Sequence, residues 1–237
     1  MLIREGDQRN ISIDIRLAVL LAGIAGALNA AGFQAVGLFS ANMTGNVSAL
    51  SDHLGLGQFS AAALFGSLIV LFIAGAFVSG LLIEAGRKRQ VRAIYAFSIA
   101  LEGLLLLLLG GLDVIVHALD QSFSLVLGLS FVMGLQNAAT TRISNARVRT
   151  THVSGMATDI GLGIAALCGG GGPEREDALA RLRLYTSTII AFLIGGVLGA
   201  ILYLLIGGYL LIITAAILFA IALPEVRRAR MKDHHAV

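Results

Sequence analysis

Amide side chains interrupt two apolar runs of this chain and are its first candidates for binding chemistry. Asn29 lies inside one run, and Gln136 and Asn137 lie inside another. A polar group in hydrocarbon costs free energy unless it is hydrogen bonded, so each amide needs a partner. Two interpretations stay open: the amides bond to a neighbouring helix, or they line a central cavity and orient a polar solute.

Two polar segments that contain glycine follow these amides. They read ANMTGNVSALSDHLGLG at 41–57 and TTHVSGMATDIGLGIAALC at 150–168. Thr44 and Ser154 are good N-cap residues, and a helix beginning there would point unpaired N–H groups at an anion. The segments are therefore predicted to be half-helices or re-entrant segments that bind a solute, the alternative being a pair of surface loops. The candidate substrate-binding residues are Asn29, Asn42, Thr44, Gly45, Asn46, Gln136, Asn137, Thr151, His152, Ser154 and Gly155.

Two acidic residues are candidates for coupling proton movement to solute binding. Glu102 lies near the centre of an apolar run, where a carboxylate must be protonated, paired or exposed to water. Asp159 lies on the helical face of Gly155 and close to His152, so a proton relay or a plain hydrogen bond between His152 and Asp159 is expected. We expect no metal site and no cofactor, because no third ligand has suitable spacing. Without a catalytic motif, no enzyme is expected.

Composition places these residues in a membrane protein. The 237 residues are 57% hydrophobic and 13% charged, with a mean hydropathy of +0.88. A soluble domain would need more polar surface and a disordered chain more charge. The sequence pI near 9.4 does not indicate nucleic acid binding, because the basic residues sit in short clusters between apolar runs.

The pattern predicts an all-α polytopic fold with six transmembrane helices. Lys and Arg cluster before the first span, between spans two and three, between spans four and five, and after the sixth. By the positive-inside rule both termini are cytoplasmic. Residues 1–16 are then a cytoplasmic segment, 17–224 a single membrane domain and 225–237 a basic cytoplasmic tail. The predicted spans are 17–38, 60–84, 92–112, 122–143, 186–206 and 209–224.

The two halves of the chain resemble each other, which predicts an internal repeat covering about 17–112 and 122–224. The matched stretches are Gly26–Ala31 with Gly134–Ala139, Asn42–Asn46 with His152–Met156, and Phe72–Ala76 with Phe192–Gly196. Each repeat has three spans, an odd number, so the second copy would be inverted in the membrane. The pairs Gly75/Ser79 and Gly195/Gly199 are small-xxx-small patterns that predict close helix packing.

With these motifs the sequence resembles the DUF1275 (YoaK-like) family of bacterial membrane proteins. The resemblance covers nearly the whole chain and rests on FSANMTGN at 39–46, GLQNA at 134–138 and TTHVSGMATDIG at 150–161. It implies a small bacterial polytopic protein and no particular substrate. Family members often carry Asp at the position of Asn29, so the resemblance does not extend to a carboxylate there.

The sequence thus favours a secondary transporter or permease for a small polar or anionic solute bound near the bilayer midplane. The alternative is a non-transporting membrane scaffold or sensor that uses the polar segments for helix contacts. Either protein would lie in the bacterial cytoplasmic (inner) membrane, with the lipid bilayer as partner. A homodimer is an open possibility, and no nucleic acid partner is expected.

Overall fold

The computed structural model describes residues 2, 10–91, 93–116, 123–169 and 174–234, and over these ranges the chain is all helical. In this described part of the chain, five helices are long and apolar enough to cross a membrane, namely α1, α3, α4, α7 and α8, as expected of a multi-pass membrane protein. The helices are α1 (Ile11–Val36), α2 (Met43–Gly55), α3 (Phe59–Lys88), α4 (Ile94–Val116), α5 (Ser124–Ile143), α6 (Val153–Cys168), α7 (Glu174–Ile206) and α8 (Tyr209–His234).

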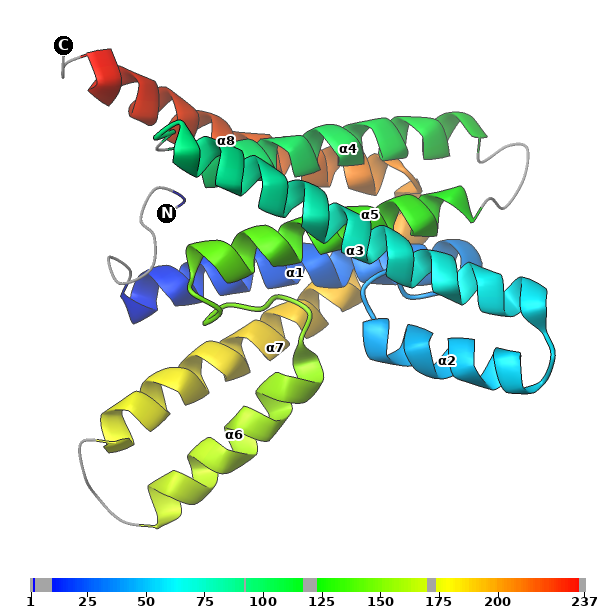
Figure 1. The fold of residues 1–237 in the computed structure, drawn as a ribbon, viewed down its shortest axis with the longest axis horizontal. Helices are drawn as coiled ribbons and strands as arrows, with labels where there is room; N and C mark the ends of the chain where they lie inside the picture. The colour runs from blue at the N-terminus through cyan, green and yellow to red at the C-terminus, as the bar shows by residue number, and fades with distance from the viewer. Residues whose placement is uncertain (1, 3–9, 92, 117–122, 170–173, 235–237) are drawn as a thin grey trace.

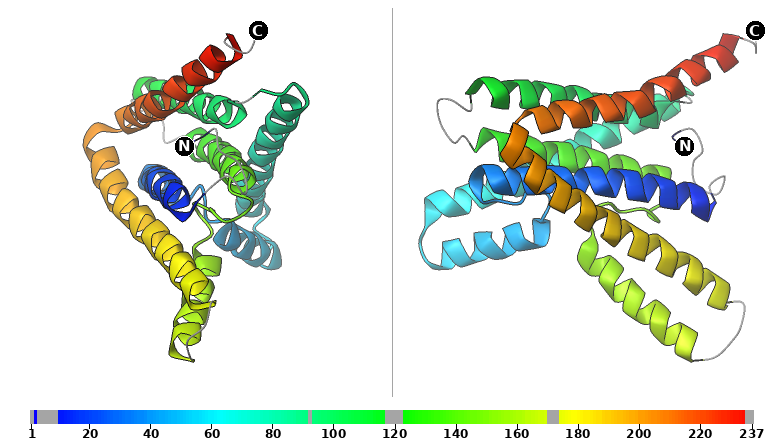
Figure 2. Two further views of the ribbon diagram at one scale, coloured as in Figure 1. Left: turned by 90° about the vertical axis from the view of Figure 1, so that its left-hand side faces the viewer. Right: turned by 180° about the vertical axis from the view of Figure 1, so that it is seen from behind.

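The long helix α5 differs from the other five in how it is covered. Its most apolar stretch is less apolar than theirs, yet most of its residues are buried, and it lies centrally in the bundle of Figures 1 and 2. A helix screened from lipid by its neighbours needs fewer apolar side chains. The fourth predicted span, 122–143, therefore exists as the helix α5, although its composition alone does not mark it as membrane-spanning.

The most extensive helix contact between the two halves of the chain has a counterpart in which the halves exchange roles. Helix α1 packs along α7, and α5, its counterpart in the second half, packs along α3. The short helix α2 lies on α3 as α6 lies on α7, and α4 packs on α8. Both views of Figure 2 show α6 and the first part of α7 splayed away from the rest of the bundle, while the later part of α7 stays beside α1.

Glycines allow the closest of these helix contacts. A Cβ on Gly26 would overlap the Phe192 carbonyl oxygen, and one on Gly134 would overlap the Phe72 carbonyl oxygen. In the same way, a Cβ on Gly75 would overlap the backbone of α5, and one on Gly195 that of α1. The small-xxx-small pattern therefore gives the close helix packing that the sequence predicted, and the backbones that it brings together belong to different halves of the chain.

Helix direction gathers the basic residues at one end of the bundle. The start of α1, the end of α3, the end of α5, the start of α7 and the end of α8 all lie toward the left of Figure 1. These five ends carry every Lys and Arg of the described helices. Arg4, Arg9 and Arg92, which entered the orientation prediction, lie outside the described residues.

Three helix boundaries differ most from the predicted spans. Helix α1 begins at Ile11 and α7 at Glu174, both well before the apolar runs that they contain. Helix α8 continues through Pro224 to His234, so the basic tail is largely helical up to that residue. Hydropathy identifies the part of a helix that lipid can cover, whereas backbone hydrogen bonding continues into polar sequence at either end.

Candidate functional site

The polar segments form the short helices α2 and α6, which both begin near the middle of the molecule. From there they run outward in opposite directions, α2 toward the right of Figure 1 and α6 toward its lower left. The view from behind in Figure 2 gives the same arrangement. The first N–H groups of both helices are therefore presented to a common central region.

The N-caps of both helices lie two residues earlier than predicted, which corrects the N-cap assignment to Thr44 and Ser154. The N-cap of α2 is Asn42, whose Oδ1 accepts a hydrogen bond from Gly45 N at 3.1 Å. The N-cap of α6 is His152, which makes no side-chain capping bond. Asn reaches the N3 amide as well as Ser or Thr does, so the earlier residue takes the role in α2.

The amides of Asn29, which is buried, and Asn137, which is partly buried, hold the linkers that lead into the two short helices. Asn29 Oδ1 accepts a hydrogen bond from Ala41 N at 2.9 Å. Asn137 Oδ1 accepts one from the Thr151 hydroxyl at 3.0 Å. Ala41 and Thr151 each directly precede the N-cap of a short helix. Each amide thus fixes where a short helix begins, in addition to lining the cavity between the two.

A cavity of about 800 Å³ separates the N-terminal ends of α2 and α6. Arg149 is the only charged residue in its lining among the described residues, with His152 beside it. The Nδ2 atom of Asn29, a side chain that is only 9% exposed, makes no hydrogen bond within the described structure. The lining residues are Asn29, Phe39, Ala41, Asn42, Met43, Thr44, Gly45, Ser48, Phe72, Asn137, Thr141, Arg149, Thr151, His152, Val153, Ser154 and Phe192.

The cavity therefore brings together most of the predicted site residues and leaves three of them out. Asn46 is buried, and its Nδ2 donates to the Phe39 carbonyl at 3.4 Å. Gln136 is fully buried, and its Nε2 donates to the Leu21 carbonyl of α1 at 3.1 Å. Gly155 lines a neighbouring cavity instead. For Gln136, the helix-to-helix hydrogen bond is the correct interpretation.

The two predicted proton-coupling acids do not line the central cavity. Glu102 is fully buried, and neither of its carboxyl oxygens has a hydrogen-bond partner in the described structure. Asp159 is exposed and lines a second cavity of about 370 Å³ together with Gly155 and His152. The helical face shared by Gly155 and Asp159 is thus as predicted.

The expected hydrogen bond between His152 and Asp159 is wrong. His152 Nδ1 instead lies 3.3 Å from Arg149 Nη1, and the His152 ring covers Gly155 so closely that a Cβ there would overlap it. Arg149 and His152 line both the central cavity and the second one. The side chains of Arg149 and His152 are consequently shared by the walls of the two cavities.

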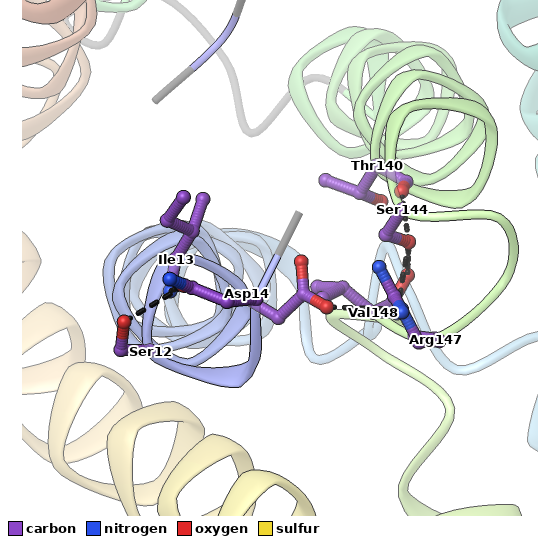
Figure 3. Close-up of polar contacts among 8 residues, drawn as sticks. Ser12, Ile13, Asp14, Thr140, Ser144, Arg147 and Val148 are labelled. Atoms are coloured by element: carbon purple, nitrogen blue, oxygen red, sulfur yellow. Dashed lines mark hydrogen bonds and ion pairs between the residues drawn. The ribbon is translucent and has the colours of Figure 1, made fainter. Parts of the chain in front are cut away.

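The linker that carries Arg149 is tied to α1 at the basic end of the bundle. Figure 3 shows Asp14 of α1 facing Arg147, whose Nε lies 3.0 Å from Asp14 Oδ2. Ser144 caps the turn after α5, donating to the Thr140 carbonyl at 2.6 Å and accepting from Val148 N at 2.9 Å. The turn places Arg149 and the start of α6 at a fixed position relative to α1.

Several lining residues were not expected from the sequence. Arg149 was counted only as a topology charge, while Phe72 and Phe192 served only as markers of the repeat. Their matched positions in the two halves were a usable signal, because equivalent residues of two repeats face a shared interface. Among the described residues, no cluster of three or more His, Cys, Asp or Glu could hold a metal ion.

Comparison with known proteins gives a family and no activity. Neither a curated protein nor a solved structure matches the chain. The family model described as "Protein of unknown function (DUF1275)" matches residues 17–223, which is most of the chain and includes the helices that line the central cavity. The chain is therefore a member of the DUF1275 family.

Proposed function

We propose that this protein is a secondary permease that binds a small anionic solute in the central cavity. The observation that carries the proposal is the lining of that cavity: two helix N-termini, one arginine and, among the described residues, no carboxylate. A helix N-terminus carries roughly half a positive charge and offers free N–H donors. Both features favour an anion over a cation.

The two helix ends contribute unequally to this charge. In α2 the Asn42 side chain already occupies the Gly45 N–H. In α6 no side chain occupies the N–H groups of Val153, Ser154 or Gly155, and the first backbone bond is made by Met156 N to the His152 carbonyl. The α6 end therefore keeps more donors available for a solute.

An inverted pair of three-span repeats would explain why the same contacts occur in both halves. The exchanged helix pairs, the glycine–carbonyl contacts and the amide–linker bonds all support it. Transporters built this way place a solute between broken helices near the bilayer midplane. Irregular backbone at that depth is tolerated only beside protein or water, which suits the linkers before α2 and α6.

The basic end of the bundle would face the cytoplasm of a bacterium, with both termini on that side of the inner membrane. The second cavity, lined by Arg147, Arg149, Asp159 and Tyr185, would form the vestibule on this side. A solute passing from it to the central cavity would move between Arg149 and His152, which line both.

Transport is tested with the full chain in proteoliposomes and a panel of radiolabelled inorganic and organic anions. We expect saturable uptake of at least one anion and none of matched cations. Uptake of no panel member would contradict the permease and favour the membrane scaffold or sensor.

Solvent access to the site is tested by thiol labelling in a Cys168→Ser background. Thr44→Cys and Ser154→Cys place a thiol at exposed cavity positions, whereas Ser79→Cys places one where the side chain is fully buried. A permease predicts that a membrane-impermeant reagent labels the first two variants and spares the third. No labelling at either cavity position would indicate a packed scaffold.

A further inference from the structure

Apolar side chains make up part of the wall of the central cavity. Phe39, Phe72 and Phe192 line it with Met43 and Val153. The Phe39 ring is itself stacked on Phe33, with ring centroids 4.5 Å apart, which fixes its position. Aromatic faces carry partial negative charge, so they disfavour a bare anion lying against them and favour an apolar group.

The cavity is also large for an inorganic anion. At about 800 Å³ it lies within the range of pockets that hold organic ligands, roughly 300–1,000 Å³. A chloride or phosphate ion in the middle would touch phenyl rings where it needs hydrogen-bond donors. An organic solute could fill this volume with its carbon skeleton and keep its charge at one end.

Only one end of the cavity is cationic. At the α6 end, Arg149 lies beside the unoccupied N–H groups of Val153 and Ser154. At the α2 end the neutral groups are the Thr44 hydroxyl and the unpaired Nδ2 of Asn29, a side chain more than nine-tenths buried. One strong anion site and one neutral polar site suit a solute with a single negative charge.

From these features we infer that the solute is a small organic monocarboxylate with an apolar or aromatic body. Its carboxylate binds Arg149 and the first N–H groups of α6, and its body lies among Phe39, Phe72 and Phe192. The inference rests on the proposed anion site and names the class of substrate. Guanidinium–carboxylate pairing gives orientation as well as affinity, because both groups are planar and can bond through two atoms.

Binding of radiolabelled benzoate to the purified full-length chain tests this assignment. Benzoate should bind saturably and be displaced by unlabelled benzoate, while benzamide, its neutral isostere, and inorganic phosphate should displace it poorly. Arg149→Gln should weaken benzoate binding about tenfold or more, and Arg149→Lys by less. Phe192→Leu should weaken it about two- to tenfold. Arg175→Gln, at an exposed α7 residue outside the cavity, is the matched control and should bind benzoate normally.

Each failure has a separate meaning, provided that the variants melt at the wild-type temperature in detergent. If phosphate or chloride is transported and benzoate does not bind, the monocarboxylate is wrong and the permease stands. If benzamide competes as well as benzoate, the role given to Arg149 is wrong. If benzoate does not bind and no anion crosses the membrane, both the solute class and the permease are wrong.

Discussion

The linkers 39–42 and 149–152, which lead into α2 and α6, have the same construction and differ in charge. In both, the residue before the N-cap bonds to an asparagine of a long helix, and the residue before that has a buried hydroxyl, on Ser40 and Thr150. The linkers differ at their first positions, Phe39 and Arg149, and at their caps, Asn42 and His152. The position of the helix start is thus common to both halves, whereas the electrostatics are not.

This difference indicates how one fold can hold a solute in a defined direction. The α2 end uses its own asparagine to satisfy an N–H group and presents an aromatic ring. The α6 end leaves its N–H groups to an external acceptor and adds a guanidinium. Two equal ends would bind an anion at either, whereas unequal ends bind it at one.

Reversing the charge of the α6 end should have the largest effect. Arg149→Glu replaces attraction by repulsion at the site, so anion uptake should fall about a hundredfold or more. Uptake in proteoliposomes measures it, with Arg175→Glu as the control for net charge. Uptake near the wild-type rate in Arg149→Glu would place the anion elsewhere and remove the distinction between the two linkers.

Adding one methyl group at the matched glycines should affect both halves alike. Gly26→Ala and Gly134→Ala each push a Cβ into a backbone carbonyl of the other half, which should cost about 1–3 kcal/mol. Thermal melting in detergent measures the loss. Gly111→Ala, where a Cβ would meet nothing, is the control and should be neutral or slightly stabilising. A loss confined to one half would argue against equivalent packing.

The parts of the fold that depend on the length of apolar runs and on the spacing of small residues could be predicted from the sequence. Six long helices, the two short ones and the glycine contacts follow from these patterns. The true starts of α1 and α7 did not follow, because a helix continues into polar sequence without any change in hydropathy that marks its end. The pairing of helices between the two halves could not be predicted either, because α1 packs on α7 rather than on a neighbour in sequence.

The site was predictable in part, for a reason that Gln136 and Asn137 illustrate. Adjacent residues on a helix point about 100° apart, so one side chain can face a cavity while its neighbour faces another helix. Asn137 lines the cavity, whereas Gln136 faces α1 and bonds to its backbone. The same geometry separates Gly45 from Asn46. Sequence placed the polar cluster correctly but could not choose between neighbours within it.

Removing the caps should distinguish stability from binding. Asn42→Ala loses the bond to Gly45 N and should destabilise the protein by about 1 kcal/mol, with anion affinity little changed. His152→Ala removes no capping bond, so stability should hold while anion affinity falls several-fold. Melting temperature and anion binding are compared on both variants. If each variant alters both properties equally, the two caps have the same role after all.

The smallest effect is expected where the linkers agree, at the buried hydroxyls that find no partner. Ser40 Oγ and Thr150 Oγ1 make no hydrogen bond within the described structure. Removing a buried polar group that is already unsatisfied loses no bond, so Ser40→Ala and Thr150→Val should change stability by less than about 1 kcal/mol, in the stabilising direction. Melting temperatures of the single and double variants measure this. A marked loss in either would mean that the hydroxyl binds water or solute, and a loss at Thr150 alone would extend the difference between the two linkers to a third position.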